Sequence, residues 1–383
     1  MLTDLLYKLS HFALFQDRLF RAGSAALFSA FLVLFLMPMF IRLSIKYNAT
    51  SDFTNKGNTA PSIIGGMLLI PVVMLSALCF TKLNADVFSI LLVMAAFFVV
   101  GAVDDFAKIW NKKKVLKGLL SKQDYQEKAD GISARLRLFL YFLFSLGVAV
   151  FAYKFIPEMD GHLTIPFIKH LLWYPYLPNW AFIILICIII TSTANGANFT
   201  DGLDSLVSIP IITTSLFVGL VAYISGNAVF SKYFLIPHLP GVDELFPLTA
   251  GIAGAVGAYL WYNSPPAQIY MGDSGSIGFG AAIGMMFILI KAELFLPIVG
   301  FIFLSEALSV FLQIGWFKLT KHLRSDKQGQ RLFLRAPIHH HFQILWKEKF
   351  KSNQELNSKI IWRFHLISIL TLLLGILIFF KIR

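Results

Sequence analysis

Residues 86–105 read DVFSILLVMAAFFVVGAVDD, an apolar run that ends directly at Asp104 and Asp105. No charged residue interrupts the run over 87–103. A helix that crosses a bilayer needs about 20 mostly apolar residues, and this stretch meets that requirement. Carboxylates at the edge of a bilayer are costly unless they have a function. The stretch therefore predicts both a membrane-spanning helix and a place to look for a site.

The same pattern recurs along the whole chain and predicts an all-α polytopic membrane protein with a single domain over 1–383. Of the 383 residues, 57% are hydrophobic and 14% are charged, whereas soluble domains carry about 25% charged residues. Cys79 and Cys187 lie inside apolar runs and indicate nothing about the redox compartment. We expect about ten transmembrane helices, at residues 20–42, 63–81, 86–103, 135–154, 179–196, 206–225, 246–262, 276–291, 294–317 and 360–380.

The distribution of Lys and Arg predicts the orientation of these helices. The odd-numbered loops with their flanks hold 23 of the 33 basic residues, so they are expected in the cytoplasm and both termini in the periplasm. The net charge of +12 then lies against anionic headgroups and attracts anionic substrates. No nucleic-acid partner is expected, because no basic stripe belongs to a recognition fold. Residues 1–16 are amphipathic, so we expect no cleaved signal peptide.

Three polar strings follow or precede apolar runs in the odd loops. The first is the pair Asp104-Asp105, where two neighbouring carboxylates need a cation or a lysine to stay charged together; ordinary helix-end acids in water are the alternative. The second, residues 195–204, is rich in amides and carboxylates that can hydrogen-bond a sugar or nucleotide and help to ligate Mg²⁺. Its alternative is that Asp204 caps the next helix.

The third string, YMGDSGS at residues 270–276, precedes the eighth apolar run. A Gly-flanked Asp273 and Ser274 at a helix N-terminus suit a phosphate or a Mg²⁺-phosphate, because free backbone N–H groups and the helix dipole point at it. A plain N-cap is the alternative reading. Each of the three strings is expected at a helix terminus.

A fourth string, His339-His340-His341, lies in a basic loop. Three consecutive histidines cannot all point one way, so zinc is disfavoured and a role as hydrogen-bond donors or cations for phosphates is preferred. Glu306 is the only carboxylate well inside a predicted span, and it is either a structural partner or part of the site. Together the four loops favour Mg²⁺-assisted phosphoryl-type transfer between a soluble nucleotide and a membrane-held acceptor.

These strings resemble those of the bacterial phospho-N-acetylmuramoyl-pentapeptide transferases, a branch of the polyprenyl-phosphate N-acetylhexosamine-1-phosphate transferase superfamily. The resemblance runs in order from residue 56 to about residue 365. The NFTDGLD string at 198–204 and the API-HHH-F string at 336–342 favour this branch over its relatives. It implies ten transmembrane helices in the bacterial inner membrane, a cytoplasmic site, Mg²⁺, undecaprenyl phosphate as acceptor, UDP-N-acetylmuramoyl-pentapeptide as donor, UMP as product, and a homodimer.

The resemblance also implies roles for individual residues. Asp273 matches the Mg²⁺ ligand, and Asp104, Asp105, Asp273 and His339 are the expected catalytic residues. Asp104 is the candidate to deprotonate or position the lipid phosphate, and Tyr270 matches an aromatic side chain that stacks on uracil. The remaining substrate-binding residues are expected to be Lys56, Asn195, Asn198, Asp201, Asp204, Asn263, Ser276, His340 and His341.

The chain departs from the family pattern in two places. The stretch before the first pair of glycines, residues 60–66, carries an extra residue, and the loop after the ninth span looks extended at 320–327. A relative that uses UDP-N-acetylglucosamine or another UDP-amino sugar is the nearest alternative function. A cation-coupled transporter is the alternative of a different class, although transporters place ionisable groups near the bilayer midplane.

Overall fold

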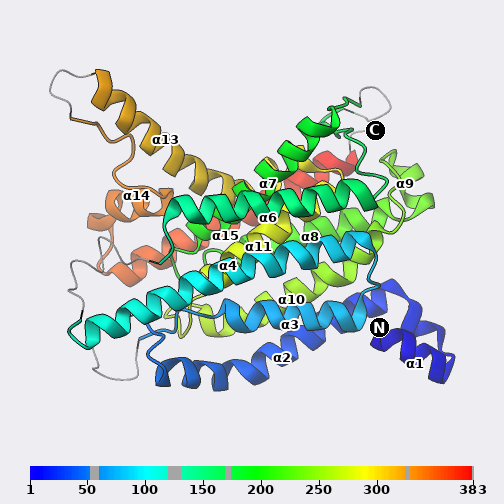
Figure 1. Cartoon of the computed structure of the whole chain (residues 1–383), viewed down its shortest axis with the longest axis horizontal. Coiled ribbons are helices and arrows are strands. Elements are labelled where there is room, and N and C mark those ends of the chain that lie inside the picture. Colours follow the sequence, from blue (N-terminus) through cyan, green and yellow to red (C-terminus); the bar gives the residue numbers. More distant parts are fainter. Residues whose placement is uncertain (52–59, 120–130, 169–173, 324–327, 382–383) are drawn as a thin grey trace.

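The computed structural model describes residues 1–51, 60–119, 131–168, 174–323 and 328–381, and in these ranges every regular element is a helix (Figure 1). Long helices run side by side to form one bundle. The elements are α1 Leu2–Ser10, η1 Ala13–Gln16, α2 Arg18–Lys46, α3 Gly66–Phe80, α4 Ala85–Leu116, α6 Ala134–Phe155, α7 Asn179–Thr200, α8 Ser208–Ser225, α9 Ala228–Phe234, η2 Val242–Glu244, α10 Leu245–Asn263, α11 Gly272–Leu289, η3 Glu293–Phe295, α12 Leu296–Val299, α13 Phe301–Leu323, α14 Ile338–Leu345, η4 Lys347–Lys349 and α15 Asn353–Lys381.

Each of the ten predicted spans coincides with helix in the structure. In the described part of the chain, nine helices are long and apolar enough to cross a membrane, and α3 is a shorter apolar helix of 15 residues. The all-α polytopic architecture is thereby confirmed. That α3 also crosses the bilayer, as the ten-span prediction requires, stays a prediction.

Two polar strings do not lie at helix termini, contrary to the prediction. Helix α4 continues past the acidic pair to Leu116, and α7 continues past Asn195 to Thr200. The residues after Val103 include no Gly or Pro before Gly118, so nothing in the sequence stops α4 where its apolar run ends. The end of hydrophobicity marks the expected membrane boundary, but it does not mark the end of the helix.

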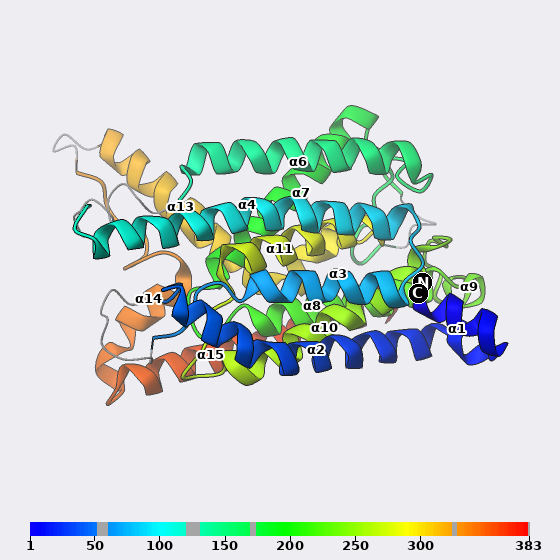
Figure 2. The same ribbon diagram turned by 60° about the horizontal axis from the view of Figure 1, so that its bottom comes forward.

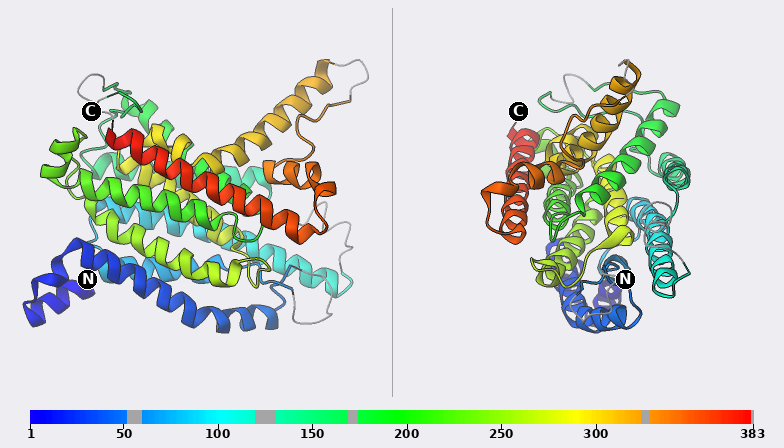
Figure 3. Two further views of the ribbon diagram at one scale, coloured as in Figure 1. Left: turned by 180° about the vertical axis from the view of Figure 1, so that it is seen from behind. Right: turned by 90° about the vertical axis from the view of Figure 1, so that its left-hand side faces the viewer.

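The ninth predicted span, 294–317, is interrupted near its start. It comprises η3, the short α12 and then α13, with the break at Gly300. Pro297 and Gly300 disfavour a continuous helix here. Beyond the break, α13 diverges from the other helices toward the end of the bundle that carries α14 (Figures 1 and 3).

Helix α11 forms the centre of the bundle (Figure 3). It packs mainly against α4 and α7, and its side chains from Ser274 to Leu289 are all buried. Small residues such as Gly278 and Ala281 allow neighbouring helices to approach closely, as is usual where lipid provides no hydrophobic drive between helices. The central position of α11 matters because its N-terminus carries Asp273.

The bundle has two distinct ends (Figures 1 and 2). The termini end contains the N-terminus and the end of α15, and the site end, opposite to it, contains α14 and the last turns of α4. At the termini end, the Arg21 guanidinium binds the Glu244 carboxylate with two hydrogen bonds of 2.6 and 2.8 Å, and both side chains are buried. This pair ties α2 to α10.

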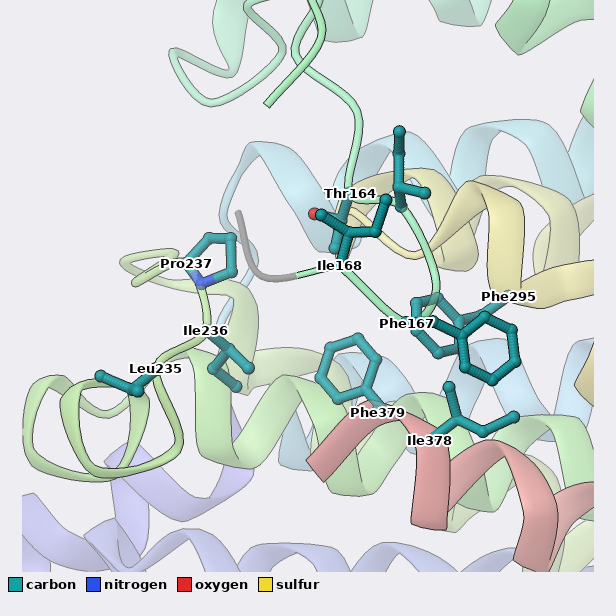
Figure 4. Close-up of a pocket in the computed structure, with 10 residues that line it drawn as sticks. Thr164, Phe167, Ile168, Leu235, Ile236, Pro237, Phe295, Ile378 and Phe379 are labelled. Atoms are coloured by element: carbon teal, nitrogen blue, oxygen red, sulfur yellow. The ribbon is translucent and has the colours of Figure 1, made fainter. Parts of the chain in front are cut away.

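A small cavity of about 30 Å³ lies at the termini end between the 164–168 segment, residues 235–237, η3 and α15 (Figure 4). The rings of Phe295 and Phe379 meet edge to face in its wall, with centroids 5.0 Å apart. Ligand pockets usually enclose about 300–1,000 Å³. This cavity is therefore a packing gap and not a substrate site.

Candidate active site

The N-terminus of α11 is held by one carboxylate from α4 and one from the turn that follows α7. The backbone N–H groups of Asp273 and Ser274 donate to Asp105 Oδ1 and Oδ2 at 3.1 and 2.9 Å, and the N–H of Gly272 donates to Asp201 Oδ2 at 3.0 Å. These groups were expected to be free for a phosphate, and that expectation was wrong. Asp105, which is 2% exposed, caps α11 from α4, an interaction that contributes about 0.5–2 kcal/mol.

Asp273 stands in the first turn of α11 and gathers partners from three other helices. Lys108 Nζ of α4 lies 3.1 Å from its Oδ2, and Arg137 Nη1 of α6 donates to the same oxygen at 3.3 Å. Asn198 Nδ2 of α7 donates to Oδ1 at 3.0 Å. The side chain of Asp273 is 13% exposed, so the carboxylate is held firmly and still reaches the surface of the site.

Asp104 is fully buried one turn before Lys108 on α4. Lys108 Nζ lies 2.9 Å from Asp104 Oδ2, so one ammonium group joins Asp104 to Asp273. The backbone N–H of Ile132 donates to Asp104 Oδ1 at 2.7 Å. Gly131 makes this approach possible, because its φ of +90° disfavours other residues and a Cβ there would collide with the Asp104 carboxylate.

The charges of this cluster do not balance. Four acidic side chains interact electrostatically here, namely Asp104, Asp105, Asp201 and Asp273. Within the described residues, two cationic side chains pair with this group, Lys108 and Arg137. Burial and the neighbouring Asp273 raise the pKa of Asp201 well above its usual range. A cluster with more carboxyl groups than cationic side chains is suited to a divalent cation, which favours their ionised forms.

The string 195–204 lies beside this cluster, partly on α7 and partly in the turn after it. Asn198 bridges Asp273 and Ser276, donating to Ser276 Oγ at 3.2 Å. Asn195 turns back on its own helix and donates to the Thr191 carbonyl at 2.8 Å. Asp204 does not cap α8; its Oδ2 accepts from the N–H of Ala267 at 3.0 Å.

Tyr270 precedes α11 and is partly buried. Burial and the Asp204 carboxylate raise the pKa of its phenol to about 12, so the ring stays neutral and its hydroxyl donates to Asp204. The Tyr270 backbone N–H donates to the Ser62 carbonyl at 2.6 Å, which joins residues 60–66 to the segment before α11. Among the expected residues, Lys56 lies outside the described part of the chain.

Asn263 lies at the end of α10 and is 1% exposed. Its Oδ1 accepts from the Ser205 N–H at 2.9 Å and its Nδ2 donates to the Ile269 carbonyl at 2.8 Å. The amide therefore joins the turn after α7 to the segment that leads into α11. Its geometry is that of a positioning residue, and a direct contact with substrate stays a prediction.

The three histidines point in different directions, as their consecutive positions require. His339 Nδ1 lies 3.1 Å from Glu306 Oε2 of α13, and both side chains are buried. His340 pairs with Gln343 at 2.6 Å, and burial lowers the pKa of its imidazole. His341 turns toward the 331–334 segment and accepts from the Leu334 N–H at 3.2 Å.

His339 is the histidine that reaches the acidic cluster. Its Nε2 is buried without a hydrogen-bond partner in the described structure, and a Cβ on Gly202 would collide with that atom. Gly202 directly follows Asp201, so the free nitrogen faces the same turn. Glu306 binds the opposite ring nitrogen, Nδ1. Because a carboxylate can only accept a hydrogen bond, Nδ1 must carry a proton and donate it.

The sequence interpretation assigned no role to Lys108 and Arg137, and it left open whether Glu306 is a structural partner or part of the site. A signal existed for Lys108, because it follows Asp104 by four residues and such pairs share one face of a helix. Arg137 reaches the site through tertiary packing and no local pattern marks it, whereas Glu306 was marked by its place inside an apolar span but its partner His339 was not.

Comparison with known proteins agrees with this geometry. Residues 87–291 match the model of glycosyl transferase family 4. The phospho-N-acetylmuramoyl-pentapeptide-transferase of a Nitratiruptor species is 38% identical over 387 residues, which cover 98% of this chain and 99% of that protein. The enzyme of the same name from Desulfotalea psychrophila is 37% identical, over 97% of both chains. The chain belongs to this transferase family.

Another phospho-N-acetylmuramoyl-pentapeptide-transferase, from Campylobacter curvus, is 37% identical over 97% of each chain. The family model ends at residue 291, so it includes Asp104, Asp201 and Asp273 but not the histidines. The full-length transferases extend the likeness over Glu306 and His339 as well. The resemblance read from the sequence motifs is thereby confirmed.

Proposed function

We propose that this chain transfers phospho-N-acetylmuramoyl-pentapeptide from its UDP-linked donor to undecaprenyl phosphate, giving lipid I and UMP for peptidoglycan synthesis. Near-full-length identity to transferases of that name carries the proposal. The acidic cluster around Asp273 supports it from chemistry, since the reaction joins two phosphate compounds whose charge must be neutralised.

Mg²⁺ is the proposed cofactor, and the residues present fit it. Within the described residues, no group of three His, Cys, Asp or Glu side chains is arranged to hold a metal alone. A magnesium ion bound with phosphates needs only one or two protein carboxylates, and the acidic cluster supplies them. Asp273 is the proposed ligand, because it is the partly exposed carboxylate of the cluster. When bound, the ion neutralises charge on the donor diphosphate.

The proposed reaction is a direct displacement. An oxygen of the lipid phosphate forms a bond to the β-phosphorus of the donor, and the bond from that phosphorus to the bridging oxygen breaks so that UMP leaves. Asp104 is held by Lys108 and by the Ile132 N–H beside Asp273, where it orients the lipid phosphate or accepts its proton. Lys108 and Arg137 attract the phosphates to this position.

His339 and Glu306 act as one unit in this proposal. When both ring nitrogens of His339 carry a proton, its Nε2–H, which faces the turn at Gly202, donates a hydrogen bond to a phosphate oxygen of the donor. Glu306 fixes the ring so that this nitrogen, and not Nδ1, faces the substrate. Glu306 is thus a positioning residue, and His339 touches the substrate.

The chain is proposed to be a multi-pass protein of the bacterial inner membrane with the site end in the cytoplasm. The N-terminus and the end of α15 lie at the end of the bundle opposite to α14, which supports this orientation. With the basic loops at the site end, the positive-inside rule then directs both termini to the periplasm. The expected homodimer stays a prediction.

The test is UMP release by the purified full chain with Mg²⁺ and undecaprenyl phosphate. Release is expected with UDP-N-acetylmuramoyl-pentapeptide and not with UDP-N-acetylglucosamine. Equal or greater release with the second donor would assign the chain to the alternative amino-sugar function. Transport of a solute into proteoliposomes without any UMP formation would reject a transferase.

A further inference from the structure

The turn between α7 and α8, residues 201–207, carries or faces several groups of the acidic cluster. Its Asp201 accepts from a backbone N–H at the start of α11, and its Gly202 lies against Nε2 of His339. Farther along, Asp204 accepts from a backbone N–H of the segment before α11. Whatever fixes the backbone of this turn therefore also fixes the geometry of the proposed donor site.

Ser205 is the strained position of this turn. Its backbone φ is +58°, in the left-handed region that residues with a side chain seldom adopt. Such a conformation persists where the surrounding structure over-determines it. Ser205 is 4% exposed, so its backbone polar groups need partners inside the protein.

Two side chains bind the backbone of Ser205 from different helices. Asn263, at the end of α10, accepts from its N–H at 2.9 Å. His365 of α15 binds its carbonyl oxygen, with Nε2 at a distance of 3.0 Å. A carbonyl can only accept a hydrogen bond, so Nε2 carries a proton and donates it. The two peptide groups that flank Ser205 are thereby held from α10 and from α15.

Apolar packing also brings α15 to this turn. Leu206 is fully buried, and it belongs to a small apolar cluster that includes Phe364 of α15. His365 follows Phe364 and is itself buried, so little water competes for the Ser205 carbonyl. Without the imidazole, that carbonyl keeps only the bond from the Ser208 N–H, at 3.1 Å, among the hydrogen bonds of the described residues.

We propose that His365 is a positioning residue of the transferase, whose Nε2–H holds Ser205 in its left-handed conformation and keeps the turn 201–207 in the shape that binds the UDP-linked donor. The inference rests on the proposed function, because this turn affects turnover only if Asp201 and His339 lie at the donor site. His365 acts through Ser205 and does not touch the substrate. A looser turn lowers the fraction of chains that can bind the donor, and the apparent affinity falls with that fraction.

The first test measures hydrogen–deuterium exchange of the purified full chain in detergent. The N–H groups of Ser205, Leu206 and Ser208 are all hydrogen-bonded, so peptides over 201–208 report how often this turn opens. His365→Met has no donor, and we expect exchange of these peptides to be about fivefold faster, as for loss of one net hydrogen bond. His365→Gln matches methionine in length and keeps an N–H donor, so its exchange should stay close to that of the unmodified chain.

Ser368→Ala is the matched control. Ser368 lies one turn farther along α15, and its hydroxyl pairs with Thr213 Oγ1 of α8 at 2.7 Å, so this variant also loses one buried hydrogen bond of α15. It should leave exchange over 201–208 unchanged. Equal acceleration in Ser368→Ala or in His365→Gln, or no acceleration in His365→Met, would overturn the proposal.

The second test measures UMP release at varied concentrations of each substrate. His365→Met is expected to raise the KM for UDP-N-acetylmuramoyl-pentapeptide about fivefold, with kcat and the KM for undecaprenyl phosphate little changed. An unchanged KM for the donor would overturn the positioning role, even with faster exchange. Absence of UMP release by the unmodified chain would instead reject the transferase proposal, and exchange would still decide whether His365 holds the turn, so the two proposals fail separately.

Discussion

At the termini end of the bundle, three acidic side chains each bind a cation of their own: Glu244 binds Arg21, Asp243 binds Arg18, and Asp160 binds Lys291. At the site end, Asp104 and Asp273 share Lys108 and Arg137, and the neighbouring carboxylates of Asp105 and Asp201 bind only backbone N–H groups of α11 among the hydrogen bonds described above. Both groups of acids lie near the ends of apolar helices, so position alone does not distinguish them. The difference lies in charge balance: paired acids fasten helices together, whereas a surplus of acids at a helix N-terminus is suited to bind an ion and a phosphate.

The largest effect is expected from Asp273→Asn at the site end. This change keeps the size of the side chain but removes the charge that Lys108 and Arg137 contact. We expect UMP release to fall at least about 100-fold at saturating Mg²⁺, as for loss of a group that stabilises transition-state charge. Near-normal turnover would show that Asp273 is not the metal ligand.

Glu244→Gln tests the opposite end and should act on stability alone. Removing one partner of a buried ion pair leaves Arg21 with an uncompensated charge, at a cost of about 3–5 kcal/mol. Thermal unfolding in detergent measures this loss, with Glu348→Gln as a surface control. Turnover per folded molecule should be unchanged, and a fall in it would break the distinction between the two ends.

Glu306→Ala and His339→Ala test whether the two residues act as one unit. Each change is expected to lower kcat about tenfold or more, with a smaller effect on KM, because His339 is then absent or no longer oriented. The double variant should be no slower than the slower single variant. Multiplying effects in the double variant would mean that Glu306 acts independently of His339.

The smallest effect is expected from Glu293→Gln, and it depends on pH. The folded carboxyl has a pKa of about 8, whereas the unfolded one ionises near its ordinary value of about 4.3. At a pH between these two pKa values, the Glu293 carboxyl is protonated in the folded state and ionised in the unfolded state. Rising pH therefore lowers the stability of the natural chain. The Tm of Glu293→Gln relative to the natural chain should therefore rise by roughly a few degrees from pH 5 to pH 8. A pH-independent difference would mean that Glu293 is ionised when folded.

The comparison of the two ends also shows what the sequence could predict. The apolar runs predicted the helices well, because hydrophobic length is a strong local signal. They did not predict that α4 continues to Leu116 or that Asp105 caps α11, since both depend on what lies beside the helix. The acidic strings predicted side chains that the fold brings together at one end of the bundle, and the family motifs supplied their expected roles.

The contacts that the site residues make with distant helices could not be predicted from the sequence. Arg137 lies in the first turn of α6, and Glu306 lies inside an apolar run on α13, so neither is adjacent in sequence to the acids or histidines that it contacts. Asn263 was expected to contact the substrate, yet both ends of its amide bind backbone or side-chain groups of the protein. Such roles follow from packing between distant helices, and a single sequence carries no direct record of it.

The most direct test of the central claim is the binding of Mn²⁺, as a paramagnetic substitute for Mg²⁺, measured by electron paramagnetic resonance on the purified full chain with UDP-N-acetylmuramoyl-pentapeptide. The acidic cluster at the site end predicts one bound ion per chain, lost in Asp273→Asn and retained in Asp160→Asn at the termini end. Equal loss of the ion in both variants, or its retention in Asp273→Asn, would contradict the account.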